Sequence, residues 1–157
     1  MANPLLNEGD RAPAFSLPAT TESGTLSLDD LRGDRAVIYF YPKDDTPGCT
    51  TEACDFRDSL ARLTAAGVRV VGVSPDGVAS HERFRGKYDL PFPLVADTDN
   101  TMARAWGVFR MKKNYGREYE GIVRSTFLIS ADGTIERIWD NVKAKGHVDR
   151  ILKDLAV

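Results

Sequence analysis

One uninterrupted apolar run, Ala36–Tyr41, constrains how this chain can fold more than any other feature. Six consecutive apolar or aromatic residues without alternation are typical of a strand buried on both faces, as in a parallel sheet. Val68–Val73 predicts a second buried strand. Between the two, apolar residues recur at helical spacing, and Gly67 stands where helix C-termini favour glycine. The sequence therefore predicts two strands of one sheet joined by a crossover helix.

The remaining segments extend this pattern in both directions. The predicted ranges are a proline-punctuated edge strand at Asp10–Thr20, its partner Thr25–Leu28, a short helix Asp29–Leu31, a helix His81–Tyr88, a strand Phe92–Val95, a short helix Thr101–Trp106, a loop or hairpin Arg110–Gly121, paired strands Ser125–Ser130 and Thr134–Trp139, and a helix after Gly146. This order predicts an α/β fold with a central mixed sheet flanked by helices and an N-terminal β-hairpin extension. The 157 residues suffice for one domain over 1–157, and no linker divides them.

Composition excludes several classes of function. The chain is 42% hydrophobic and 28% charged with a net charge of −2, which is typical of a globular protein. No basic stripe suggests nucleic acid, and we interpret the short cluster Arg110, Lys112 and Lys113 as solvated. No apolar run reaches the length of a membrane span, and the first ten residues do not resemble a signal peptide. We therefore expect a cytoplasmic protein without membrane or nucleic-acid partners.

The two cysteines, Cys49 and Cys54, lie five residues apart just after the first buried strand. Thr46 is a suitable N-cap for the helix that follows, and Pro47 suits the first helical position. Cys49 then occupies the third position, where free backbone N–H groups and the helix dipole favour a thiolate over a thiol. Gly48 would let a substrate oxygen approach the backbone closely. This arrangement predicts a reactive nucleophile.

The spacing of the cysteines conflicts with a static disulfide. On an intact helix, residues i and i+5 have Cα atoms roughly 8–9 Å apart, beyond the about 7 Å limit for a disulfide. Bonding between them would require the first helical turns to unwind. The alternatives are two unrelated free thiols or a metal site. The second is disfavoured because His81 and His147 are far apart in sequence; we expect His81 on a helix surface and His147 near a helix start.

These residues resemble the peroxiredoxin family. The spacing Pro42-x-x-x-Thr46-x-x-Cys49 resembles its active-site signature, and the longer run Thr46–Cys54 is similar to the bacterioferritin-comigratory-protein, or Q-type, branch. Nearly the whole chain takes part, through three further segments: Gly9–Leu17, Arg124–Ile129 and Lys145–His147. The resemblance implies a thioredoxin-like fold and a thiol-dependent peroxidase that needs no cofactor or metal.

The resemblance also implies roles for individual residues. Cys49 would be the peroxidatic cysteine, which attacks a hydroperoxide and becomes a sulfenic acid. Arg124 would stabilise its thiolate and the charge on the peroxide oxygens. Cys54 would resolve the sulfenic acid as an intramolecular disulfide, which thioredoxin or a similar dithiol would reduce. The protein would then be an antioxidant enzyme of the atypical two-cysteine type, acting as a monomer.

Three further residues would support this chemistry. Thr46 would donate a hydrogen bond to the peroxide, Pro42 would shape the pocket and shield the thiolate from water, and Glu52 would hold Arg124 in place. Two other functions remain open at this point: a disulfide oxidoreductase of thioredoxin type, which would favour Cys-x-x-Cys spacing, and a redox-sensing interaction protein. Consumption of many peroxide equivalents per chain distinguishes an enzyme from a sensor.

Overall fold

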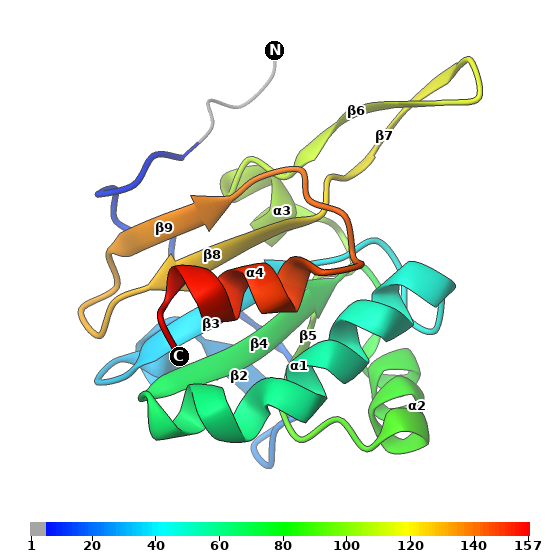
Figure 1. The fold of residues 1–157 in the computed structure, drawn as a ribbon. Helices are drawn as coiled ribbons and strands as arrows, with labels where there is room; N and C mark the ends of the chain where they lie inside the picture. The colour runs from blue at the N-terminus through cyan, green and yellow to red at the C-terminus, as the bar shows by residue number, and fades with distance from the viewer. Residues whose placement is uncertain (1–5) are drawn as a thin grey trace.

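A computed structural model describes residues 6–157. Its centre is a five-stranded mixed sheet with the strand order β5-β4-β3-β8-β9 (Figure 1). Strand β3 pairs in parallel with β4 and antiparallel with β8, so it is the middle strand of the sheet. The five strands are β3 (Arg35–Phe40), β4 (Val68–Ser74), β5 (Leu94–Ala96), β8 (Ser125–Ile129) and β9 (Ile135–Trp139). The predicted buried run Ala36–Tyr41 therefore forms most of the central strand of the sheet.

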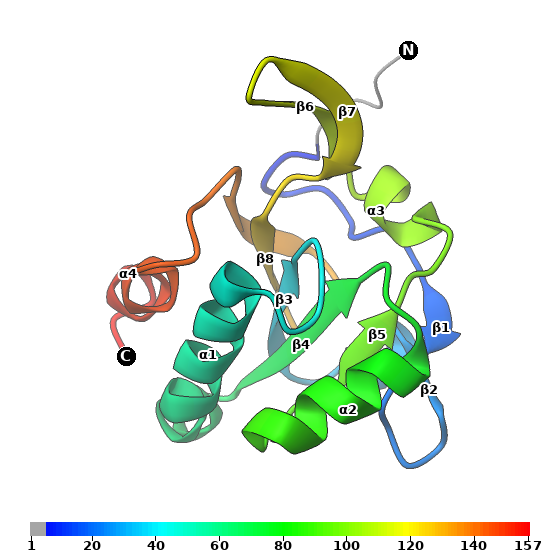
Figure 2. The same cartoon turned by 90° about the vertical axis from the view of Figure 1, so that its right-hand side faces the viewer.

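Both faces of this sheet are covered, because alternate residues of β3 enter two different cores. Val37 and Tyr39 pack with apolar residues of three helices, α1 (Pro47–Ala65), α2 (Val78–Tyr88) and α4 (His147–Asp154). Ile38 and Phe40 pack on the opposite face with the N-terminal segment and α3 (Thr101–Ala105). Figure 2 shows these two layers on either side of the sheet. The mixed sheet with helices on both faces is confirmed.

Two small antiparallel ribbons lie outside the central sheet. The N-terminal hairpin pairs β1 (Ser16–Pro18) with β2 (Thr25–Ser27), and a 3₁₀ turn, η1 (Asp29–Leu31), follows it. The edge strand is shorter than predicted, because residues around Pro13 run beside β9 without forming a regular strand. The segment predicted as a loop or hairpin is a hairpin of β6 (Phe109–Asn114) and β7 (Arg117–Ile122).

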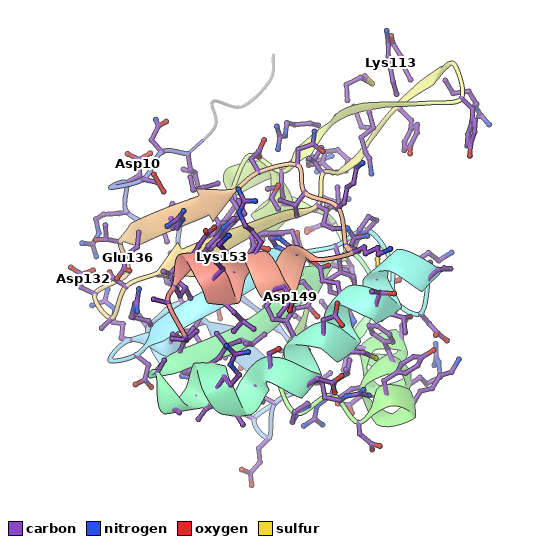
Figure 3. All side chains as sticks on the ribbon, viewed as in Figure 1. Asp10, Lys113, Asp132, Glu136, Asp149 and Lys153 are labelled. Carbon is purple, nitrogen blue, oxygen red and sulfur yellow. The ribbon has the colours of Figure 1, made fainter. Side chains whose placement is uncertain are left out.

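The β6–β7 hairpin projects from the body of the molecule, with Lys113 near its tip (Figure 3). Lys113 forms an exposed ion pair of 3.5 Å with Glu118 on the opposite strand, as expected from the predicted solvated cluster. Arg110, at the base of the hairpin, is less exposed than Lys113 and forms an ion pair with Asp140. Within residues 6–157, no helix is long and apolar enough to cross a membrane.

The sheet places the cysteine helix at one edge of the molecule. Strand β3 continues as buried backbone to Tyr41, whose N–H donates to the Val73 carbonyl at 3.0 Å. A loop of five residues then leads into α1, which begins at Pro47 and is followed by Gly67 at a φ of +76°. Because β3 and β4 are parallel, the loops that leave their carboxyl ends meet at this edge. The segment that follows β7 leads Arg124 into β8, the other neighbour of β3.

Candidate active site

The N-terminus of α1 forms as the sequence predicts, with one difference in its cap. Thr46 is the N-cap residue in extended conformation, and Pro47 is the first helical residue. The Thr46 hydroxyl, however, donates to the Lys43 carbonyl at 2.9 Å and makes no hydrogen bond to the helix. The prediction of Thr46 as the N-cap is confirmed, although its hydroxyl closes the preceding turn and does not bond to the helix. The first-turn N–H groups, which an α-helix leaves without intrahelical partners, therefore receive no hydrogen bond from this hydroxyl.

Cys49 lies in the first turn of α1 and is only 2% exposed. Its Sγ is 3.4 Å from Nη2 of Arg124, a residue 75 positions away in the sequence. A guanidinium at this distance favours the charged form of a thiol, as does the positive end of the helix dipole. A Cβ on Gly48 would lie 3.3 Å from the same Nη2 atom, so the absence of a side chain there leaves room for the arginine.

Glu52 lies one turn after Cys49 and binds the same arginine. Its Oε1 accepts from Arg124 Nη1 at 2.5 Å, and the Glu52 side chain is fully buried. Burial raises the pKa of Glu52 from 4.5 to about 7, although the guanidinium acts in the opposite direction. Burial alone would lower the pKa of Arg124, yet the charges of Glu52 and Cys49 raise it. The Arg124 guanidinium thus faces two acidic groups, Cys49 and Glu52. Protonation of Glu52 leaves the guanidinium more available to the Cys49 thiolate.

Cys54 lies farther along α1, half-buried, and both cysteines are free thiols in this structure. Continuous helix from Pro47 to Ala65 holds them on different sides of α1. The geometric conflict expected from their spacing is therefore present in the reduced protein. A disulfide between Cys49 and Cys54 requires the helix to unwind.

The segment that leads into α4 contacts the backbone of Arg124. The Val142 N–H donates to the Arg124 carbonyl at 2.9 Å, which fixes the backbone of the arginine. His147 is the first residue of α4, as expected, and its Nε2 is 2.7 Å from the Thr126 hydroxyl. Burial, aided by the charge of Arg124, lowers the pKa of His147 from 6.5 to about 4, so the ring is neutral at neutral pH. Pro42 is half-buried in the loop before the helix.

The expectation that His81 lies on a helix surface is wrong. His81 is fully buried, with its two ring nitrogens 2.7 Å from Asp44 and 2.9 Å from the Val95 carbonyl. Among residues 6–157, a group of three possible metal ligands is formed by Asp44, Asp76 and His81. The signal was available, because His81, Phe84 and Tyr88 share the i, i+3, i+7 spacing of one helix face. Asp44 was not predicted as a functional residue, although it lies in the loop between β3 and Cys49.

Comparison with known proteins decides the family. Residues 8–138 match the model of the AhpC/TSA family. The chain belongs to the AhpC/TSA family. It is 51% identical over 144 residues to a putative peroxiredoxin bcp of Coxiella burnetii, covering 92% of this chain and 95% of that relative.

Solved structures of AhpC/TSA proteins agree with this assignment. A bacterioferritin comigratory protein of Xanthomonas campestris, studied for alkyl peroxide reduction, superposes with a TM-score of 0.83 at 43% identity over 90% of both chains. A variant of Xylella fastidiosa PrxQ gives 0.89 at 36% identity over 98% of both chains. The thioredoxin-like fold and the resemblance to the Q-type branch are confirmed.

Membership of this branch of the AhpC/TSA family establishes the class of enzyme. The chain is a thiol-dependent peroxidase of the peroxiredoxin type, in which a second cysteine resolves the oxidised first one. Proteins of this family act on hydroperoxides and use thioredoxin-type reductants. The disulfide oxidoreductase and the non-enzymatic sensor are therefore set aside.

Proposed function

We propose that Cys49 is the attacking nucleophile of this peroxidase. Its thiolate attacks the terminal oxygen of a hydroperoxide, an S–O bond forms and the O–O bond breaks. The departing oxygen takes up a proton and leaves as water or an alcohol, and Cys49 becomes a sulfenic acid. The observation that carries this proposal is the 3.4 Å contact between Cys49 Sγ and Arg124 Nη2 at the N-terminus of α1.

Arg124 supplies the charge that this step requires. Its guanidinium remains protonated and offers several hydrogen-bond donors. It can therefore bind the thiolate and also the peroxide oxygens, on which negative charge develops during the reaction. Glu52 fixes the guanidinium through the 2.5 Å contact with Nη1. Gly48 leaves the space that the arginine occupies. These contacts support positioning roles for Glu52 and Gly48.

Thr46 and Pro42 belong to the loop in front of the thiol. The Thr46 hydroxyl donates a hydrogen bond to the Lys43 carbonyl in the resting enzyme, and rotation about its side chain would direct this hydrogen bond to a peroxide oxygen. Pro42 is half-buried in this loop and offers no backbone N–H. We assign Thr46 to substrate binding and Pro42 to shielding the thiolate from water.

Cys54 resolves the sulfenic acid. Its thiolate attacks the Cys49 sulfur, an S–S bond forms, and the hydroxyl leaves as water after taking up a proton. The first turns of α1 unwind for this step, because the intact helix separates the two sulfurs. A thioredoxin-type dithiol then supplies two electrons and is itself oxidised to a disulfide. We also propose that residues 1–157 act as one domain, as a monomer, in the cytoplasm.

Steady-state peroxide consumption with a thioredoxin system tests this assignment. The wild type is expected to consume many equivalents of hydrogen peroxide per chain. Cys49→Ser is expected to consume none, whereas Thr64→Ser, an exposed change on the same helix, retains full turnover. Circular dichroism establishes that both variants are folded. Turnover by Cys49→Ser would contradict the proposal, as would a wild type that consumes a single equivalent.

A further inference from the structure

Asp44 is an acidic residue buried in the loop between β3 and α1. Only 7% of it is exposed, and its carboxylate accepts three side-chain hydrogen bonds. Tyr41 Oη donates to Oδ1 at 2.6 Å, while Ser80 Oγ and His81 Nδ1 lie 2.8 and 2.7 Å from Oδ2. A buried carboxylate is tolerated when its oxygens are bonded and its charge is paired. The partners here come from the end of β3 and the first turn of α2.

The hydrogen bonds of His81 determine its charge. Its Nε2 is 2.9 Å from the Val95 carbonyl, which can only accept, so Nε2 must carry a hydrogen. The contact of 2.7 Å between Nδ1 and Asp44 requires a second hydrogen between these two atoms. Because Tyr41 and Ser80 already stabilise the anion of Asp44, this second hydrogen belongs on the ring. This geometry favours a buried Asp44–His81 ion pair over an open metal site.

The same loop is tied to the sheet and to α2 by two further groups. The Asp44 N–H donates to Asp76 Oδ2 at 2.8 Å, and that oxygen also accepts from Ser74 at the end of β4. The next residue, Asp45, has a φ of +57°, and its carboxylate accepts from Lys87 and Tyr88 at 2.8 Å each. None of these ties involves α1, so unwinding α1 leaves every one of their partners in place.

We propose that the buried Asp44–His81 ion pair is a fixed anchor for the loop that carries the reactive cysteine. In the reduced protein it sets where α1 begins, and so positions Cys49, five residues later, against Arg124. In the disulfide form it stays intact and confines unwinding to the residues after the loop. Both residues are positioning residues, and this inference rests on the proposed roles of Cys49 and Cys54.

Nuclear magnetic resonance of the histidine rings tests the charge state without reference to activity. The chain has two histidines, so a His147→Gln variant assigns the remaining ring signals to His81. We expect both nitrogens of His81 to carry hydrogen at neutral pH. A ring with one protonated nitrogen would overturn the ion pair.

Hydrogen exchange on the unmodified protein tests the anchor itself. In the disulfide form, amides between Cys49 and Cys54 are expected to lose protection, whereas the Asp44 amide retains it. Equal loss of protection at both places would overturn the anchor. This measurement needs no variant and therefore does not depend on a substituted protein folding.

Single-turnover kinetics test positioning. Asp44→Asn keeps the size of the side chain and removes its charge, and we expect it to slow the first oxidation of Cys49 by about tenfold. Lys87→Met removes only the exposed ion pair with Asp45 and leaves the hydrogen bond from Tyr88, so it is expected to react as the wild type does. An Asp44→Asn variant that folds and reacts at the wild-type rate would overturn positioning. A wild type that fails to react with peroxide would instead contradict the proposed function.

Discussion

Replacing Glu52 with glutamine tests how pH controls the unwinding of α1. Glu52 lies between the two cysteines, so the segment that must unwind exposes its buried carboxyl to water. The pKa of Glu52 is about 7 in the folded helix against 4.5 in solvent. Each unit of this pKa difference changes the free energy of unwinding by about 1.4 kcal/mol, so the whole difference contributes about 3 kcal/mol. That corresponds to about two orders of magnitude in the unwinding equilibrium.

The sign follows from the raised pKa of Glu52. Below pH 4.5 the carboxyl is protonated in both states, and its contribution to the folded helix is fully present. As the pH rises toward about 7, the unwound state loses its proton first, and this contribution is lost. Unwinding, and with it formation of the Cys49–Cys54 disulfide, should therefore become easier across this range. Glutamine imitates the protonated carboxyl at every pH and should abolish the effect.

Stopped-flow fluorescence with one equivalent of peroxide separates the two steps. The phase whose rate does not depend on peroxide concentration reports disulfide formation. Above about pH 7 we expect Glu52→Gln to be slower in this phase than the wild type by about two orders of magnitude, and at acid pH the two should converge. Ionisation of Cys54 affects both proteins alike and cancels in the ratio. Glu82→Gln, exposed on α2, is the matched control and should follow the wild type. Parallel pH profiles for wild type and Glu52→Gln would refute the reasoning.

Three further substitutions give distinct outcomes. Cys54→Ser should leave the first oxidation intact and block recycling by thioredoxin, so mass spectrometry should find sulfenic or higher oxides on Cys49; normal steady-state cycling would contradict this. Arg124→Lys should slow the first oxidation by about a hundredfold, because a single ammonium cannot hold two acidic groups in the same fixed geometry; an unchanged rate constant would exclude that role. Gly72→Ala should destabilise the fold by about 1–3 kcal/mol in urea unfolding, because its Cβ would lie 2.8 Å from Leu94; an unchanged midpoint would show that the core relaxes freely.

Local signals made much of the fold predictable from the sequence. The apolar run at Ala36–Tyr41 identified β3, because a strand buried on both faces has no polar alternation. The start of α1 followed from Thr46 and Pro47, whose backbone preferences act within a single turn. The partner of the Thr46 hydroxyl was not predictable, because it depends on how the preceding loop folds back. Local sequence preferences thus predicted that Cys49 lies in the first turn of the helix, but not the hydrogen bonds around it.

Contacts between residues far apart in the sequence could not be predicted from local patterns. Arg124 is 75 residues from Cys49, and it reaches the thiol only because β8 pairs with β3. No periodicity in the sequence specifies that strand order, so the arginine entered only through the family resemblance. The β6–β7 hairpin was ambiguous for another reason. Its strands carry polar residues on both faces, and its turn uses Tyr115 and Gly116 at positive φ, without the usual Asn-Gly signature.

The most direct test of this account is the ionisation of the Cys49 thiol, followed by the ultraviolet absorption of the thiolate as a function of pH. A Cys54→Ser protein leaves Cys49 as the only thiol. We expect the thiolate band to be present already at neutral pH, and Arg124→Met to move its appearance to more alkaline pH. A band that appears only under alkaline conditions, with or without the arginine, would contradict it.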